Sequence, residues 1–280
     1  MKDLKNKVAV ITGAAEGIGK AIAQLAAARG MKLVLADLNP KTLQATAEEF
    51  TAQGVEVLTQ VVDVSDETQV AALAKAAFDR FGGVNLLVNN AGVALAKTVW
   101  DTTQKDWNWV MGVNLYGVTN SLRAFLPPML ESGQDGHVVN VASLAGLLSE
   151  PGLAAYNASK FAVVTVSEGL HHDLTLRQAP IKVSVLCPGW VKTRIAEAER
   201  HRAQDERSDP TKLDGATLKV GMAMRKAVEN GIGTDQVAQA VFDAVDREQF
   251  YILIPQQAAQ AVQVRMTDIL ENRQPTLLPI

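Results

Sequence analysis

The sequence predicts an α/β fold: a doubly wound parallel sheet of about seven strands with helices on both faces, in a single domain. Short apolar runs alternate along the chain with longer amphipathic segments, an order that right-handed crossovers convert into a parallel sheet. The 280 residues are 48% apolar and 20% charged, enough to bury one large core. No repeat, low-complexity tract or linker separates a second domain.

The predicted strands are short runs rich in Val, Ile and Leu, mostly followed by turn residues. They are residues 8–11, 32–36, 55–62, 85–88, 137–141, 182–186 and 251–254. The predicted helices carry apolar residues at three- and four-residue spacing. They are residues 17–29, 40–53, 66–81, 103–131, 155–177 and 234–248. Pro40 at a first helical position and Asp66 as a cap or first-turn acid support two of the helix starts.

Charge and cysteine content restrict the possible partners. A formal net charge of -3 and a pI near 5.9 give no basic footprint for nucleic acid or an anionic membrane. A single cysteine, Cys187, excludes an intrachain disulfide and a Cys-based metal cluster. The N-terminus lacks a signal-like apolar region, and no apolar run reaches membrane-spanning length. We therefore expect a cytoplasmic protein that binds small molecules.

A glycine-rich turn, TGAAEGIG at residues 12–19, follows the first predicted strand, where ligands of doubly wound sheets bind. Gly13, Gly17 and Gly19 permit a tight turn and close approach of the backbone to a pyrophosphate. The following helix points its N-terminal N–H groups at that anion. The turn lacks the Lys-Ser/Thr pair of a nucleoside-triphosphate loop, which disfavours kinases and ATPases.

Acidic residues near this turn indicate which nucleotide it binds. Asp37 ends the second predicted strand about twenty residues after the turn, where an acid can bind the adenosine ribose hydroxyls. NAD is favoured over NADP because a 2′-phosphate would meet the negative charges of Asp37 and Glu16. No Arg or Lys directly follows Asp37 to bind such a phosphate. A solvated carboxylate is the alternative for Asp37. Asp63, beside Val64, could reach the adenine edge, although an ordinary turn before a helix explains it almost as well.

Tyr156 and Lys160 share one face of the predicted helix 155–177, because residues i and i+4 lie one above the other. A free phenol has a pKa of about 10, and a nearby ammonium favours the phenolate. Lowering this pKa by about three units, roughly 4 kcal/mol, would make Tyr156 a base for alcohol oxidation beside a nicotinamide. An isolated Tyr-x-x-x-Lys motif on a helix is usually a pair of solvated surface residues. Its occurrence here together with a nucleotide-binding turn favours a catalytic role.

Together these features resemble the classical short-chain dehydrogenase/reductase family over nearly the whole chain. The resemblance rests on TGAAEGIG at 12–19, Asn89-Asn90-Ala91-Gly92, Asn114, Ser143, Tyr156-x-x-x-Lys160 and Pro188-Gly189. It implies a Rossmann-type fold, a nicotinamide cofactor and catalysis by Ser143, Tyr156 and Lys160, with Asn114 assisting. In the family, Asn114 would bind a water that links Lys160 to solvent, and Lys160 would also hold the nicotinamide ribose.

Ser143 follows the predicted strand 137–141, where its hydroxyl can orient a substrate oxygen and stabilise charge developing on it. A serine at a strand end is otherwise a turn residue. The predicted cofactor contacts come from the turns after the strands and from the catalytic helix. They are Gly13, Glu16, Gly17, Ile18, Gly19, Asp37, Leu38, Asp63, Val64, Asn90, Ala91, Gly92, Tyr156, Lys160, Pro188, Gly189, Val191 and Thr193.

The insertion at residues 194–233 is expected to form a lid that determines the substrate. Its apolar members are Ile195, Leu213, Leu218, Met222 and Met224, and residues 200–207 are expected to form a solvated helix. With Val93, Ser143, Leu144, Leu147 and Trp190 nearby in the family fold, an apolar pocket is expected. This pocket predicts a hydrophobic or aromatic secondary alcohol and its ketone as substrates.

Other conspicuous residues are assigned structural roles. His171 and His172 are adjacent in a helix and face different directions, so no metal is expected. Trp100, Trp107 and Trp109 are expected to pack the start of a long helix. Residues 255–280 predict a C-terminal helix and tail. Pairing of the two longest helices across a two-fold axis would give a homodimer or homotetramer.

Three functions remain open from the sequence. The first is an NAD-dependent dehydrogenase or ketone reductase, and the second is an NADP-linked 3-oxoacyl-type reductase. The third is a nucleotide-sensing protein that keeps the fold without catalysis. Intact Ser143, Tyr156 and Lys160 argue against the third.

Overall fold

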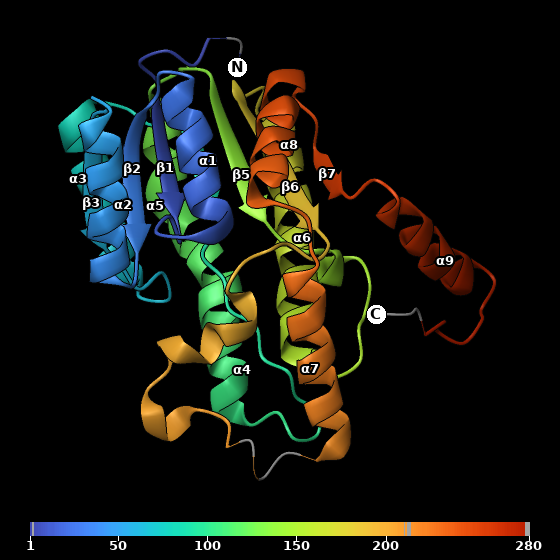
Figure 1. Cartoon of the computed structure of the whole chain (residues 1–280). Helices are drawn as coiled ribbons and strands as arrows, with labels where there is room; N and C mark the ends of the chain where they lie inside the picture. Colours follow the sequence, from blue (N-terminus) through green and yellow to red (C-terminus); the bar gives the residue numbers. More distant parts are fainter. Residues whose placement is uncertain (2, 210, 212–213, 278–280) are drawn as a thin grey trace.

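A single sheet of parallel strands forms the centre of the molecule, and helices pack on both of its faces (Figure 1). The computed structural model of the chain describes residues 1, 3–209, 211 and 214–277. The 7-stranded sheet has the order β3-β2-β1-β4-β5-β6-β7. Its strands are β1 (Val8–Thr12), β2 (Lys32–Asp37), β3 (Val57–Val61), β4 (Leu86–Asn89), β5 (Gly136–Val141), β6 (Ile181–Pro188) and β7 (Tyr251–Ile254). The predicted fold class is confirmed.

The direction of winding reverses between β1 and β4, which pair side by side in the sheet. A crevice at such a reversal, outside the carboxyl ends of the strands, is where doubly wound sheets bind ligands. Polar side chains brace the sheet there. Asn89 Nδ2 donates to Asn140 Oδ1 at 2.8 Å, and Asn140 Nδ2 donates to Ser167 Oγ at 2.9 Å, which ties β4 and β5 to the helix behind them.

The helices follow the strands in the predicted order, except that α7 within the insertion was not predicted. They are α1 (Gly17–Ala28), α2 (Pro40–Ala52), α3 (Glu67–Phe81), α4 (Gln104–Met111), α5 (Gly117–Glu131), α6 (Ala154–Leu176), α7 (Gly215–Glu229), α8 (Thr234–Arg247) and α9 (Ala258–Leu270). Helices α1 and α8 pack together on one face of the sheet, and α3 and α5 on the other. Asp66 caps α3 as expected, because its carboxylate accepts from the N–H groups of Thr68 and Gln69.

The predicted helix 103–131 is interrupted, and this is the main local correction. A π-helical turn, Gly112–Tyr116, separates α4 from α5. At its end Gly117 presses against Val64, where an added Cβ would lie 2.6 Å from the valine side chain. A π turn inserts an extra residue into the helical period and is frequent at functional sites. Here it carries Asn114.

The insertion after β6 also differs from expectation. Residues 200–207 do not form a solvated helix: short 3₁₀ turns occupy Ile195–His201 and Gln204–Glu206, and Arg202 between them is buried. The helix α7 follows, capped by Asp214, whose carboxylate accepts from Thr217 N at 2.7 Å. Asp is a favoured N-cap residue, so the sequence contains a local signal for the start of α7 that was not used in the prediction.

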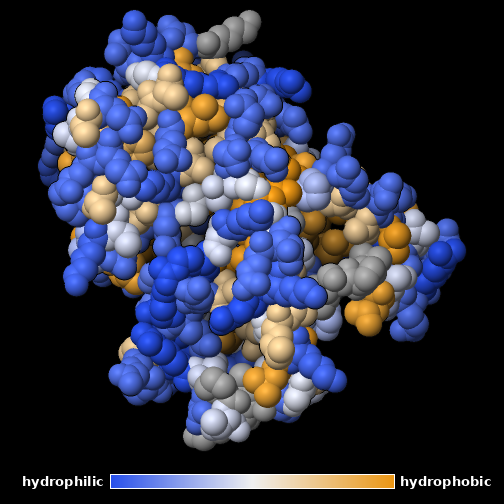
Figure 2. All heavy atoms as spheres, viewed as in Figure 1, coloured by the Kyte–Doolittle hydropathy of each residue, from blue (hydrophilic) through white to orange (hydrophobic). Residues whose placement is uncertain are grey.

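The C-terminal helix α9 extends outward beyond β7 (Figure 1). Figure 2 shows hydrophobic atoms among hydrophilic ones in this region, where Ile269 and Leu270 are 52% and 74% exposed. Helix α9 therefore leaves apolar side chains uncovered at the edge of the molecule. Among the described residues, every helix is too short or too polar to span a lipid bilayer.

Candidate active site

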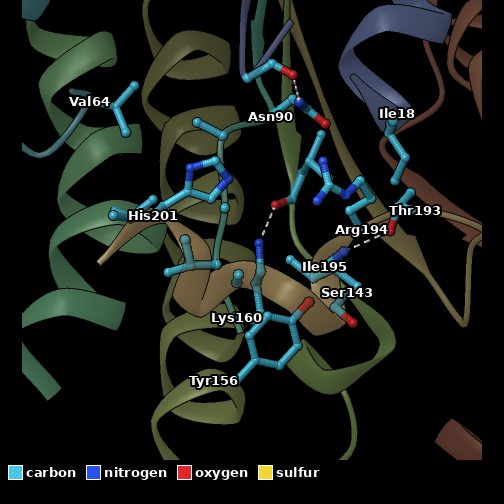
Figure 3. A pocket seen from close by; sticks show the side chains of 18 of the residues that line it. Ile18, Val64, Asn90, Ser143, Tyr156, Lys160, Thr193, Arg194, Ile195 and His201 are labelled. Atoms are coloured by element: carbon cyan, nitrogen blue, oxygen red, sulfur yellow. Dashed lines mark hydrogen bonds between the residues drawn. The ribbon is translucent and has the colours of Figure 1, made fainter. Parts of the chain in front are cut away.

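A cavity of about 410 Å³ opens at the carboxyl ends of the central strands (Figure 3). It reaches from the turn after β1 to the insertion after β6, so residues far apart in sequence share one space. Of the predicted cofactor contacts, Gly19 is the one that does not line it. Ser143, Tyr156 and Lys160 lie in the same cavity.

The glycine turn fits the diphosphate of a dinucleotide. Gly13 and Gly17 have φ of +62° and +60°, the left-handed region that favours glycine. They leave the backbone uncovered at the N-terminus of α1, where an anion meets the free N–H groups and the helix dipole. Gly19 has another role: an added Cβ would lie 2.2 Å from Gly13 O and 2.5 Å from Asn90 Nδ2. Gly19 therefore allows the turn to close and is not a cavity contact, contrary to the sequence prediction.

Asn90 holds this turn from β4. Its side-chain Nδ2 donates to the carbonyl oxygens of Thr12 at 2.9 Å and Gly13 at 3.0 Å. Its backbone N–H also donates to Thr12 Oγ1 at 3.0 Å. Asn90 thus joins the ends of β1 and β4 and fixes the shape of the turn.

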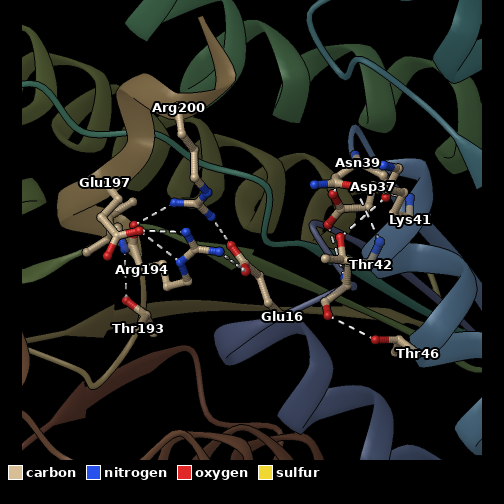
Figure 4. Close-up of polar contacts among 12 residues, drawn as sticks. Glu16, Asp37, Asn39, Lys41, Thr42, Thr46, Thr193, Arg194, Glu197 and Arg200 are labelled. Atoms are coloured by element: carbon tan, nitrogen blue, oxygen red, sulfur yellow. Dashed lines mark hydrogen bonds and ion pairs between the residues drawn. The ribbon is translucent and has the colours of Figure 1, made fainter.

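The acids at the ends of β2 and β3 are both engaged by nearby groups. Asp37 Oδ2 accepts from Ala15 N and Oδ1 accepts from Asn39 N, each at 3.0 Å (Figure 4). Asp37 therefore connects the glycine turn to the start of α2. Asp63 Oδ1 accepts from Ser65 N at 2.9 Å and Ser65 Oγ at 2.7 Å, as an ordinary turn before a helix requires. Both acids line the cavity, as predicted.

Glu16 has a different environment from the one the sequence suggested. It forms ion pairs with Arg194, at 3.6 Å, and with Arg200 (Figure 4). Its negative charge is therefore compensated, and the expectation that it repels a 2′-phosphate is wrong. Of the two acids invoked against NADP, Asp37 alone keeps that role.

Tyr156 and Lys160 stand together on α6, as their spacing predicts (Figure 3). Lys160 Nζ lies 5.6 Å from the centre of the Tyr156 ring and donates to the carbonyl oxygen of Val141 at 2.9 Å. Lys160 is buried, with 3% of its surface exposed. Ser143 Oγ, at the end of β5, accepts from Ala145 N at 3.1 Å.

The ionisation of these groups differs from expectation. Burial raises the pKa of Tyr156 to about 12; a hydrogen bond with Ser143 acts in the opposite direction, and the nearby Glu150 carboxylate adds to the rise. Burial lowers the pKa of Lys160 to about 8. The sequence prediction assigned a lowered Tyr156 pKa to Lys160 together with the positive charge of an oxidised nicotinamide. Lys160 does not achieve this by itself, and the contribution of the nicotinamide stays a prediction. Burial disfavours the charged form of both groups and is the largest cause of each shift.

Asn114, in the π turn, is buried and does not line the cavity. Its Nδ2 donates to Val93 O and to Ser159 Oγ, both at 2.9 Å, and its Oδ1 accepts from Val93 N at 2.8 Å. Asn114 and Lys160 both approach Gly92, where an added Cβ would lie 3.4 Å from Asn114 Oδ1 and 3.5 Å from Lys160 Nζ. Asn114 thus joins the π turn to α6, and its role in a water relay stays a prediction.

The cavity contains part of the predicted substrate wall. Val93, Ser143, Leu144 and Trp190 line the cavity, but Met222 is 73% exposed and points away from it. The helical phase of α7 turns Met224 and Val228 inward instead. Leu218 is 39% exposed, Leu147 packs in the core, and Leu213 lies outside the described residues.

Sequence reasoning missed a buried charge cluster that connects the insertion to α4. Arg202 Nη1 donates to Asp106 Oδ1 at 2.7 Å, and Lys97 Nζ donates to Asp106 Oδ2 at 2.8 Å. The Arg202 guanidinium also lies 4.7 Å from the centre of the Trp109 ring, and both residues line the cavity. The spacing Thr103-x-x-Asp106 is a capping-box signal that marks Asp106, but nothing in the sequence pairs it with Arg202.

The three tryptophans that were predicted to pack the start of a long helix, Trp100, Trp107 and Trp109, have different environments. Trp100 is 79% exposed, so its predicted packing role is wrong. Trp107 packs against the cluster of buried apolar residues beside α4, and Trp109 forms part of the cavity wall.

Known proteins resemble this chain over most or all of its length. A family model described as short chain dehydrogenase matches residues 7–204. A short chain dehydrogenase/reductase from Burkholderia phymatum, solved in complex with NAD, is 43% identical, covers 100% of this chain and 99% of its own, and superposes with a TM-score of 0.96.

Two relatives of named activity are also similar. A protein from Lactiplantibacillus plantarum named CLA biosynthesis dehydrogenase/reductase is 36% identical over 277 residues, which are 98% of this chain and 97% of that protein. The 1-deoxy-11-beta-hydroxypentalenate dehydrogenase of Streptomyces avermitilis is 33% identical over 252 residues, 89% of this chain and 84% of that protein.

Proposed function

Since the chain belongs to the short-chain dehydrogenase family, we propose that it is an NAD-dependent oxidoreductase acting on a hydrophobic or aromatic secondary alcohol and its ketone. The observation that carries this proposal is the cavity itself. It brings Ser143, Tyr156 and Lys160 together with the glycine turn and with apolar side chains such as Leu144, Trp190 and Met224.

In ketone reduction, Tyr156 donates its phenolic proton to the carbonyl oxygen while the carbonyl carbon receives the hydride. A pKa of about 12 keeps this phenol protonated near neutral pH, so it is available as a general acid. The Ser143 hydroxyl positions the same oxygen and stabilises the charge that develops on it. A bound nicotinamide supplies or accepts the hydride and, when oxidised, adds a positive charge beside Tyr156.

Alcohol oxidation uses the same groups in reverse. Tyr156 must then act as a base, which burial opposes. The ammonium of Lys160 favours the phenolate by attraction, and Lys160 is connected to the end of β5 through Val141. We infer that the cation of the oxidised cofactor completes this stabilisation, since Lys160 alone does not achieve it.

The substrate class is supported by the apolar side chains that line the cavity beside Tyr156, several of which pack in one cluster. They include Val93, Leu144, Trp190, Ile195, Met224 and Val228. One relative is named as the dehydrogenase of a hydroxylated pentalenate, which agrees with a secondary alcohol as substrate.

A substrate panel tests the proposal directly. NADH or NAD consumption is followed by absorbance with aromatic and cyclic aliphatic ketones and alcohols, sugars and a 3-oxoacyl thioester. We expect turnover of the apolar ketones, with kcat/KM at least about tenfold above that of the sugars and the thioester, because a buried apolar wall discriminates by transfer free energy. Preference for the thioester would support the 3-oxoacyl reductase, and NADH binding without turnover across the panel would support the nucleotide sensor.

Cofactor choice is tested at Asp37. The Asp37→Asn variant removes the charge and keeps an oxygen for one of the two N–H groups, Ala15 or Asn39, that the carboxylate binds. We expect its ratio of kcat/KM for NAD over NADP to fall about tenfold or more, because a charged hydrogen bond is lost and a 2′-phosphate is no longer repelled. Asp246→Asn, a surface variant with the same change in charge, should leave the ratio unchanged. A wild-type enzyme that prefers NADP would contradict our assignment of NAD.

The predictions of a cytoplasmic location and of a homodimer or homotetramer accompany this proposal. Both stay predictions. Light scattering across a concentration series measures the oligomeric state.

A further inference from the structure

We propose that Arg200, with Arg194 beside it, binds the diphosphate of the nicotinamide cofactor, and that Glu16 is the counter-ion that positions both arginines over the N-terminus of α1. This inference rests on the proposed function and adds two residues from the insertion to the cofactor site. It starts from the ion pairs that cross from the insertion to the glycine turn (Figure 4).

The geometry brings the insertion against the diphosphate position. A Cβ added at Gly17 would lie 3.3 Å from the Thr193 side chain, so the chain after β6 contacts the first turn of α1. Arg194 is the next residue, and Arg200 Nη1 donates to its carbonyl oxygen at 2.8 Å. Both arginines and Glu16 line the cavity that holds the predicted cofactor contacts.

The charges explain why arginines are needed there. Glu16 is the N-cap residue of α1, beside the helix end that would receive the diphosphate, yet its side chain makes no capping hydrogen bond. Uncompensated, its carboxylate would repel that anion. Pairing with two guanidinium groups removes the repulsion and holds them at the site.

Arg200 is the better diphosphate ligand of the two. Arg194 is also held by Glu197, through Nε at 2.9 Å and Nη2 at 2.6 Å. The bonds of Arg200 to Glu16 and to the Arg194 carbonyl use only part of the five N–H donors of a guanidinium. A planar guanidinium can donate to two phosphate oxygens at once.

The experiment compares ligands that do and do not carry a diphosphate. Dissociation constants for NADH are measured by fluorescence titration, and those for ADP and adenosine by calorimetry. We expect Arg200→Met to weaken NADH and ADP binding about 10- to 100-fold, as loss of a charge-assisted bond predicts, and to leave adenosine unchanged. The dissociation constants of Arg200→Lys for NADH and ADP should lie between those of Arg200→Met and the wild type. Lysine keeps the positive charge but cannot donate two parallel hydrogen bonds as a guanidinium does.

Two further variants make the outcome specific. Lys192→Met removes a positive charge from the same segment at an exposed residue outside the cavity lining, and it should bind all three ligands like the wild type. Glu16→Gln should weaken ADP binding less than Arg200→Met does, because it loses the contacts that position the arginines but also removes a negative charge beside the diphosphate. Unchanged ADP binding in Arg200→Met, or equal weakening of adenosine, would overturn the proposal. A wild-type protein that binds no NADH would instead overturn the proposed function.

Discussion

The Tyr156→Phe variant is expected to lose about 100- to 10,000-fold in kcat, the usual contribution of a general acid, while its dissociation constant for NADH stays within about twofold of the wild-type value. Phenylalanine keeps the aromatic ring and its packing, so the substitution removes only the phenolic hydroxyl and its exchangeable proton. Steady-state kinetics with the best ketone of the panel, combined with NADH titration, measures both quantities.

A second tyrosine provides the control for this variant. Tyr116, at the end of the π turn, is 55% exposed, and Tyr116→Phe should have wild-type kinetics. The pH profile adds a separate readout. Because burial raises the Tyr156 pKa to about 12, oxidation by the wild type should accelerate as pH rises above neutral, and the residual activity of Tyr156→Phe should not. Residual activity above about a tenth of wild type would exclude Tyr156 as the acid.

The fold was predictable because its signals are local. Buried parallel strands are continuous apolar runs, so β1, β2 and β7 were found within one residue of their observed ends. The order of strands and helices then fixes the topology, which places the ends of β1, β4, β5 and β6 around one crevice. That geometry indicates the glycine turn and the acids after β2 and β3 as candidate cofactor contacts, and the family resemblance supplied others, such as Val191 and Thr193.

What could not be predicted depends on side-chain direction and on long-range pairs. Met222 and Met224 are equally apolar, and the phase of α7 decides which of them faces the cavity. Glu16 and Arg200 lie 184 residues apart in the chain, so their ion pair has no local signal. The pKa of Tyr156 is set by burial within the folded cavity, which the spacing of two residues does not report.

The Asp106–Arg202 pair supports the largest stability prediction, because both side chains are almost fully buried, with 2% and 1% of their surfaces exposed. Burial works to raise the Asp106 pKa, but hydrogen bonds from Lys97, Thr103 and Arg202 outweigh it and lower the pKa to about 2. The carboxylate is therefore charged in the folded protein. Its stabilising effect is present above the ordinary pKa of 3.8 and is lost as the pH falls toward 2.

Asp106→Asn removes this charge and keeps an oxygen for the capping box with Thr103. It leaves the Arg202 guanidinium buried, with Glu199 at 3.6 Å as its remaining acidic partner. We expect the free energy of unfolding to fall by about 3 kcal/mol, the usual cost of an unpaired buried charge. Denaturant unfolding measures it. Because Arg202 also forms part of the cavity wall, KM for the apolar ketone should rise while NADH affinity changes little.

The double variant Asp106→Asn with Arg202→Met distinguishes a charge effect from a packing effect. With both charges gone, the remaining cation of the cluster, Lys97, has 13% of its side chain exposed and can turn toward water. The double variant should therefore recover at least about half of the stability lost in Asp106→Asn, since a neutral buried pair carries no desolvation penalty. Glu67→Gln, which breaks the exposed pair with Arg123, should lose far less stability, because solvent screens that pair. If Asp106→Asn were no more destabilised than Glu67→Gln, the cluster would not be what holds the insertion against α4.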